Sequence, residues 1–167
     1  NDAPVLDLDA SAGGDGYTTT YIYAGGRAAV KIVDTDVLIT DVDTQNIASV
    51  TIDISTNFND RGTDSLAFNN INPSKFTSTY NAGTGTLVIS TIGGQTANLA
   101  EYQAALREVT FDNVSANRAR TRSVDITVTD AQGATSNTAT TSIVFSTSTA
   151  PIAIVAGASG NEDAAYI

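Results

Sequence analysis

Short segments in which apolar and polar residues alternate recur along almost the whole chain. The clearest is 47–54, where Ala48, Val50, Ile52 and Ile54 fall on one side of an extended backbone. Loops of a few residues separate these segments, and residues 81–85 have the composition of a hairpin loop. This spacing predicts an all-β domain, an antiparallel two-sheet sandwich, with strands over 4–8, 17–23, 28–33, 47–54, 76–80, 86–91, 123–129 and 137–145.

One stretch has a helical pattern instead. Asn98 is a favourable N-cap residue, and Glu101 three positions later completes the spacing of a capping box. Apolar residues then recur near the helical period from Leu99 to Val109. We therefore predict a short helix over 99–107, laid across one end of the sandwich to close its core.

Composition excludes several classes of function. The chain has 8 basic and 18 acidic residues, a formal net charge of −10, which disfavours nucleic acid and anionic membrane surfaces. It has no His and no Cys, which excludes the usual zinc sites, thiol nucleophiles and Ser-His-Asp triads. No apolar run approaches the ~20 residues of a membrane helix, so no membrane insertion is expected. Nothing near the acidic pairs would raise one carboxyl pKa above its partner's, and we expect no enzyme.

Aspartates occur in pairs where strands are expected to end. The two members of a pair are one residue apart, so they point the same way on an extended backbone. Two carboxylates about 5 Å apart repel by roughly 3 kcal/mol at an effective dielectric of ~20. Calcium would relieve this repulsion, because it takes six to eight hard oxygen ligands. The pairs are Asp7 and Asp9, Asp34 and Asp36, and Asp41 and Asp43.

The two ends of the chain echo each other. Asn1-Asp2-Ala3-Pro4-Val5 opens it, and 148–152 repeats the pattern of small or polar residues, Ala, Pro and a β-branched residue. The echo predicts one repeat over 1–148, followed at 149–167 by a linker and the first strand of the next repeat. The polar start, without a signal peptide, is typical of the interior of a longer polypeptide. The alternative is that the strand-like stretch 152–155 adds to a neighbouring subunit of a filament.

As an ordered set, these motifs resemble the cadherin-like repeats of giant bacterial secreted adhesins and RTX-type surface proteins. The residues that carry the resemblance are 1–4, 39–43, 99–113 and 128–137, and the helix motif is also similar to the chondroitin-sulfate-proteoglycan-type repeat. The resemblance implies an extracellular, Ig-like sandwich of seven or eight strands, joined end to end with its copies. It also implies calcium at the junctions, which would make the module a rigid spacer in cell adhesion.

The resemblance implies particular calcium ligands as well. Many relatives carry a Glu near the end of the second strand, where this chain has 24–26 (Ala-Gly-Gly), so Asp7, Asp9 or Asp15 would have to replace it. Asp34 and Asp36 are a further candidate pair, although they could form a plain turn, as could Asp7 and Asp9. By analogy with the relatives, the implied ligands are Asn1, Asp2, Asp41, Asp43 and Asp130.

Two other clusters have a binding and a structural interpretation. Arg118, Arg120 and Arg122 share a face of an extended chain, where they could dock an acidic polysaccharide or simply balance an acidic surface. Tyrosines at 17, 21 and 23 could stack on a sugar, but packing within a sheet is the more usual role. These clusters favour a glycan- or receptor-binding module as the alternative function. Residues 59–64 form an acidic segment that we expect to be a solvated loop.

Overall fold

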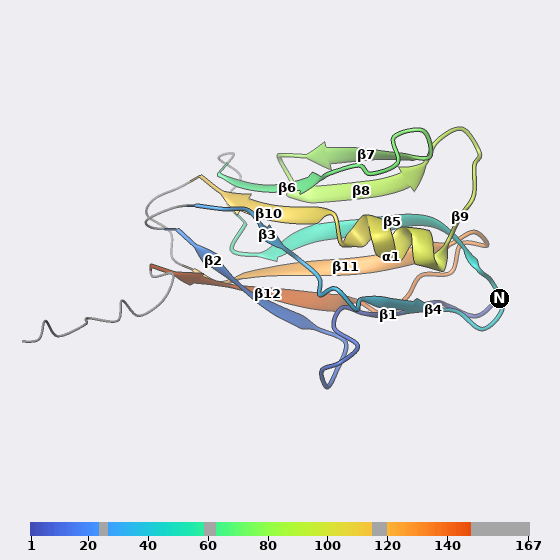
Figure 1. Cartoon of the computed structure of the whole chain (residues 1–167), viewed down its shortest axis with the longest axis horizontal. Coiled ribbons are helices and arrows are strands. Elements are labelled where there is room, and N and C mark those ends of the chain that lie inside the picture. Colours follow the sequence, from blue (N-terminus) through green and yellow to red (C-terminus); the bar gives the residue numbers. More distant parts are fainter. Residues whose placement is uncertain (24–26, 59–62, 115–119, 148–167) are drawn as a thin grey trace, which may run out of the picture.

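The structure is a computed structural model and describes residues 1–23, 27–58, 63–114 and 120–147. This part of the chain is mostly β-strand, with one short helix (Figure 1). In chain order the elements are β1 Val5–Asp7, β2 Tyr17–Ile22, β3 Val30–Lys31, β4 Leu38–Thr40, β5 Asn46–Thr56, β6 Asp64–Phe68, β7 Phe76–Asn81, β8 Thr86–Thr91, β9 Ala97–Asn98, α1 Leu99–Leu106, β10 Val109–Asn113, β11 Arg122–Asp130 and β12 Ala139–Ser146.

The largest sheet has the order β2-β12-β11-β5-β8-β7, and β9 pairs with the start of β5. Its described neighbours are antiparallel except at one edge, where β2 runs parallel to β12. The prediction of a purely antiparallel fold is therefore wrong at this edge. Parallel pairing is possible because β2 enters the sheet from β1, which belongs to a different sheet, and so no hairpin ties its direction to that of β12.

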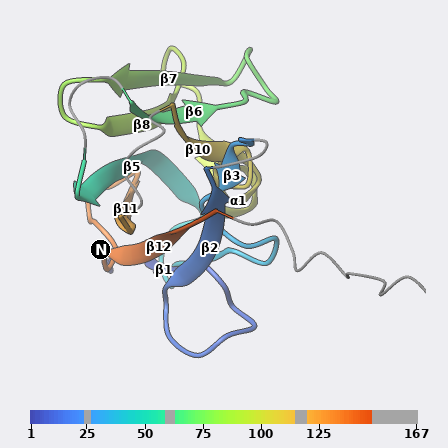
Figure 2. The same cartoon turned by 90° about the vertical axis from the view of Figure 1, so that its left-hand side faces the viewer.

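A second layer faces the large sheet. It contains a three-stranded sheet, β3-β10-β6, and a two-stranded ribbon, β1-β4. Figure 2 looks along the sandwich, with β3, β10 and α1 on the side of the core opposite β5 and β11. The facing layer is thus divided where a single second sheet was predicted. The architecture is consistent with an all-β sandwich.

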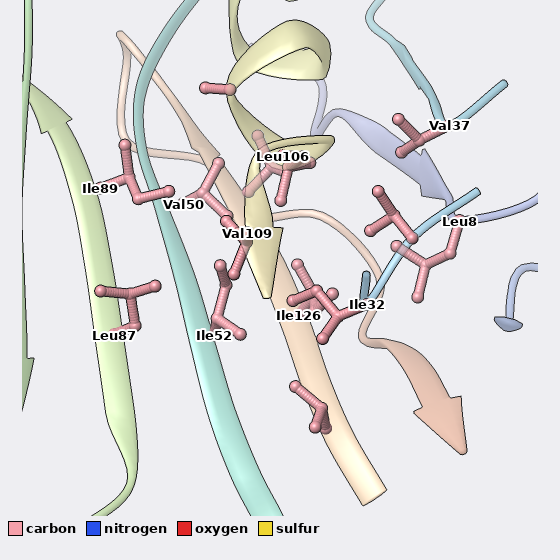
Figure 3. Packing of buried hydrophobic residues seen from close by; sticks show 14 of the residues in the cluster. Leu8, Ile32, Val37, Val50, Ile52, Leu87, Ile89, Leu106, Val109 and Ile126 are labelled. Atoms are coloured by element: carbon pink, nitrogen blue, oxygen red, sulfur yellow. The ribbon is translucent and has the colours of Figure 1, made fainter. Parts of the chain in front are cut away.

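One hydrophobic core fills the space between the layers. In Figure 3, Leu8, Ile32 and Val109 approach Ile52 and Ile126 across this space. All five side chains are fully buried. Burying a side chain of this kind stabilises a fold by about 1.5–3 kcal/mol relative to leaving it exposed. Burial of this core is therefore a main source of the stability of the sandwich.

The predicted helix is confirmed, ending one residue early at Leu106. Its capping box is complete, because the Asn98 side chain accepts a hydrogen bond from Glu101 N–H and the Glu101 side chain accepts one from Asn98 N–H, both at 2.9 Å. The Tyr102 ring is buried, and its hydroxyl donates to the carbonyl of Ala48 at 2.7 Å. Through these contacts α1 closes the core, as predicted.

Each predicted strand segment contains a strand, and the β7–β8 hairpin closes at Asn81 as expected. Four strands were not predicted, namely β4, β6, β9 and β10. In β10 the residues Val109, Phe111 and Asn113 alternate inward, although Val109 also continues the helical spacing of apolar residues that begins at Leu99. The strand β6 begins at Asp64, inside the segment that was predicted to be a solvated loop.

A β-bulge interrupts the pairing of β5 with β11. Thr129 lies opposite Ser49 and Asp130 opposite Ile47, so Ala48 is the extra residue. As a result Ile47 is buried and Ala48 is exposed, which corrects the prediction that Ala48 faces the core with Val50. The bulge lies beside the end of β11 that carries Asp130.

Candidate metal site at the amino-terminal end

The β1–β4 ribbon divides the predicted metal ligands into two groups. Val5 pairs with Thr40 at one end of the ribbon, and Asp7 pairs with Leu38 at the other. Residues before β1 therefore meet those that follow β4, whereas residues after β1 meet those that precede β4. We call Asn1, Asp2, Asp41 and Asp43 the amino-terminal group, and Asp7, Asp9, Asp34 and Asp36 the turn group.

Asp130 completes the candidate site from another strand. Along β11 the residues that face inward are Arg122, Val124, Ile126, Val128 and Asp130. Both ends of this buried row are charged, and Asp130 is only 1% exposed. None of the ion pairs among the described residues involves Asp130. A carboxylate in this position needs other compensation, because a buried charge without a partner is unfavourable.

Backbone groups supply part of that compensation. Asp130 Oδ1 accepts hydrogen bonds from Gln132 N–H at 2.8 Å and from Ala134 N–H at 2.9 Å. Burial raises the pKa of Asp130, but hydrogen bonds from Ala134 N–H, the Asn1 side chain, and Gln132 and Gly133 N–H outweigh this effect and hold the pKa below its ordinary value. The side chain is thus a buried anion at neutral pH. Its other oxygen, Oδ2, is buried and has no hydrogen-bond partner.

In Asp41 too, one carboxylate oxygen accepts hydrogen bonds and the other has no partner. Its Oδ1 accepts hydrogen bonds from Asp43 N–H at 3.0 Å and Thr44 N–H at 3.1 Å, which fixes the turn after β4. Its Oδ2 is buried without a partner, like Oδ2 of Asp130. Buried side-chain oxygens are normally paired, so two open carboxylate oxygens at one end of a domain require a physical explanation.

The first residues of the chain lie beside the turn after β4, where they contact Asp43. Asp43 Oδ2 accepts a hydrogen bond from Asp2 N–H at 2.9 Å and lies 3.6 Å from the backbone nitrogen of Asn1. The bond from Asp2 holds the pKa of Asp43 below its ordinary value. The Asn1 side chain also helps to lower the pKa of Asp130, which places the start of the chain close to the end of β11.

The donor set at this end consists of oxygens. Carboxylate and amide oxygens suit calcium far better than a metal that prefers nitrogen or sulfur. No three acidic side chains in the described ranges converge closely enough to form a metal-binding group. A cation would therefore draw its shell from Asp41, Asp130, the Asn1 amide, backbone carbonyls and water, and the first residues would have to move to close it.

The turn group is used differently. Asp7 accepts a hydrogen bond from Asp9 N–H at 3.1 Å, and Asp9 accepts one from the Ser11 hydroxyl at 2.9 Å. Asp34 bonds to both the hydroxyl and the N–H of Thr35, which hold the pKa of Asp34 below its ordinary value. These are turn-stabilising contacts, and they favour the plain-turn interpretation for these residues. Asp36 is exposed, and Asp15 accepts from the Asn137 side chain at 2.8 Å.

Of the predicted arginine face, the described residues Arg120 and Arg122 do not share one exposed surface. Arg122 is 1% exposed, and its Nε donates to Asp64 Oδ2 at 2.8 Å in an ion pair that is buried on both sides. The Arg122 guanidinium also lies 5.0 Å from the centre of the Phe145 ring. Arg120 is exposed, and Arg118 lies outside the described residues. The reason is the inward alternation of β11, which turns Arg122 into the core.

The tyrosines adopt the structural role. Tyr21 is fully buried, and its ring centre lies 5.2 Å from that of Phe145 and 5.8 Å from that of Phe111. Tyr17 and Tyr23 are half-buried against the core. Packing within the sheet is therefore confirmed for this stripe. The segment 24–26, residues 59–62 and the tail 149–167 lie outside the described residues.

Comparison with known proteins adds no identification. No model of a known protein family matches the chain, and no curated protein matches it either. The resemblance to cadherin-like repeats therefore remains a prediction from the motifs. None of the helices in the described part of the chain is long and apolar enough to span a membrane.

Proposed function

We propose that this domain is a cadherin-like structural repeat stiffened by calcium, which serves as a rigid spacer in a long extracellular adhesin or surface fibre. One observation supports this most strongly: Asp41 and Asp130 each keep a buried carboxylate oxygen without a partner at the amino-terminal end. Calcium is the cation whose ligand preference matches such oxygens. Bound there, it would tie the first residues to β4 and β11 together.

The shape of the domain agrees with a spacer. Asn1 lies at one end of the long axis, and β12 ends at Ser146 towards the other (Figure 1). Copies joined in series would therefore extend a rod instead of folding back on one another. An ion beside Asn1 and Asp2 would restrict bending where the chain enters the sandwich. Neighbouring repeats of the same polypeptide or fibre are the partners that this function requires.

The expected affinity is modest. Extracellular calcium modules bind with dissociation constants of about 10⁻⁴–10⁻³ M. At about 10 mM calcium, such a site stabilises the folded state by about 1.4–2.7 kcal/mol. For a domain of this size, that free energy corresponds to a rise in melting temperature of about 3–11 °C.

Thermal unfolding with calcium and with chelator tests the proposal. The natural sequence should melt higher in calcium, whereas magnesium at the same concentration should have a much smaller effect. Asp130→Asn should remain folded but lose the increment given by calcium. Asp53→Asn is the matched control, because Asp53 lies in the middle of β5, and this variant should keep the increment. Identical melting curves of the natural sequence in calcium and chelator would rule the proposal out.

A further inference from the structure

The strands β2 and β12 form the one parallel pair in the described sheets. Both run towards the end of the sandwich at which β12 finishes, away from Asn1 (Figure 1). The amino-terminal side of the chain reaches β2 from its first residue, whereas the carboxyl-terminal side leaves from the last residue of β12. A pull on the two sides of the chain therefore draws these two strands in opposite directions along their common axis.

This geometry decides how the hydrogen bonds between the strands are loaded. When neighbouring strands slide along each other, all the bonds between them carry the load together and must break together. When strands are pulled apart from one end, the bonds break one at a time and each at low force. We propose that the β2–β12 pair is the mechanical clamp of this domain, loaded in shear when the chain is stretched. The clamp deepens the proposed spacer function, on which its biological use rests.

The pairing is long enough to act as a clamp. It spans six residue pairs, from Tyr17 opposite Thr141 to Ile22 opposite Ser146. Tyr23 N–H extends it by donating to the carbonyl of Ser146 at 3.0 Å. Before the load reaches β2 it meets β1, which pairs with β4 over only three residues. The shorter β1–β4 ribbon should therefore yield first and transfer the load to β2 and β12.

A side-chain anchor reinforces the pair. The buried Tyr21 of β2 packs on the partly buried Phe145 of β12, and the two residues also lie opposite each other in the register. The Tyr21 hydroxyl is 2.7 Å from Asp112 Oδ1 and from the carbonyl of Asn113 on β10. Sliding β2 by one residue would move this buried ring out of place as well as break the backbone bonds. The anchor thus opposes shear independently of the ladder.

Two neighbouring threonines provide a matched test of the ladder. Successive N–H groups of a strand point to opposite sides. Because Tyr23 N–H faces β12, that of Thr19 faces β12 too, whereas that of Thr20 faces the outer edge of the sheet. Thr19→Pro therefore removes a clamp bond, and Thr20→Pro introduces the same ring without removing one. With handles at both chain ends, at constant force and in chelator, Thr19→Pro should unfold about 10-fold faster than Thr20→Pro, the effect of roughly one net hydrogen bond.

The direction of loading provides a second test that needs no proline. The chain has no cysteine, so two introduced ones attach handles uniquely. In the A12C/T138C variant one handle is attached just before β2 and the other just before β12, at the same end of the parallel pair. Force applied there pulls the two strands apart from that end, so their hydrogen bonds break one after another. At equal force the domain should survive much longer when pulled by its chain ends than through this variant.

Equal lifetimes in the two pulling directions would overturn the clamp, as would equal unfolding rates of Thr19→Pro and Thr20→Pro when both fold. Because every measurement is made in chelator, the result is separate from the calcium proposal. If the forced-unfolding results are as expected but the melting temperature is the same in calcium and in chelator, only the calcium proposal is refuted.

Discussion

Arg122 and Asp130 occupy the two ends of the same inward-facing row on β11, and each side chain is 1% exposed. Apolar residues separate them. Arg122 has an ion-pair partner from β6, since its Nε lies 2.8 Å from Asp64 Oδ2. The Oδ1 atom of Asp130 accepts hydrogen bonds from backbone N–H groups, and its Oδ2 atom has no hydrogen-bond partner. One strand thus carries a buried charge that an ion pair neutralises and another that has no ion pair among the described residues.

Removing the charge of Asp64 should be costly. Asp64→Asn leaves the Arg122 guanidinium buried without its counter-charge, which typically costs about 3–5 kcal/mol. Urea unfolding monitored by circular dichroism measures this loss. The control is Glu108→Gln, which breaks the more exposed pair with Lys31 at 3.1 Å and should cost at most about 1 kcal/mol. Similar small losses for both variants would contradict a structural role for the buried pair.

Removing the charge of Asp53 should stabilise the domain. Asp53 lies directly opposite Asp125 in the β5–β11 pairing, and like charges in that position repel. Thr86 and Thr140 donate to the two carboxylates at 2.7 Å, bonds that an asparagine can also accept. Asp53→Asn or Asp125→Asn should each add about 0.2–1 kcal/mol to the free energy of unfolding. In a double-mutant cycle at low salt, the double variant should gain no more than either single one. Strictly additive gains would exclude repulsion between the two residues.

Gly85 should not tolerate a side chain. Its φ is +77°, and a Cβ built there would lie 2.8 Å from the Phe58 ring. Gly85→Ala should therefore destabilise the domain by about 1 kcal/mol or more. Gly83→Ala in the same loop is the control, because the nearest atom to its Cβ, at 3.3 Å, is the end of the Asn81 side chain. Chemical unfolding of both variants provides the comparison, and equal stabilities would contradict the account of this turn.

The helix cap should make stability depend on pH. The pKa of Glu101 is lowered from its ordinary value of 4.5. The main cause is the hydrogen bond from Lys75, and the hydrogen bond from Asn98 N–H adds to it. A lowered pKa stabilises the fold above the ordinary value, and this contribution is lost as the pH falls through the lowered one. Near neutral pH the free energy of unfolding of the natural sequence should exceed that of the Glu101→Gln variant by about 0.2–1 kcal/mol. The gap should close on acidification, and a gap that persists below the lowered pKa would exclude this cause.

Local signals predicted most of the fold. The alternation of apolar residues identified the long strands, and the cap chemistry at Asn98 identified the helix. The parallel pairing of β2 could not be predicted, because it depends on how the chain crosses between layers and not on any local pattern. The bulge at Ala48 could not be predicted for a similar reason, because it depends on the register with the partner strand.

The candidate site was predicted as a set of residue types, without its division into two groups. That division follows from the pairing of β1 with the unpredicted strand β4. One missed signal was present in the sequence. The alternation of Val124, Ile126 and Val128 continues to Arg122 on one side and to Asp130 on the other. Followed to its ends, it predicts that both charged residues are buried.

Anomalous X-ray scattering from crystals grown in millimolar calcium tests the central claim most directly. We expect a calcium peak at the amino-terminal end, with Asp130 Oδ2 and Asp41 Oδ2 each about 2.3–2.6 Å from the ion. The contradicting result is a crystal in the same calcium concentration with no peak there and both oxygens bonded only to water or to protein groups.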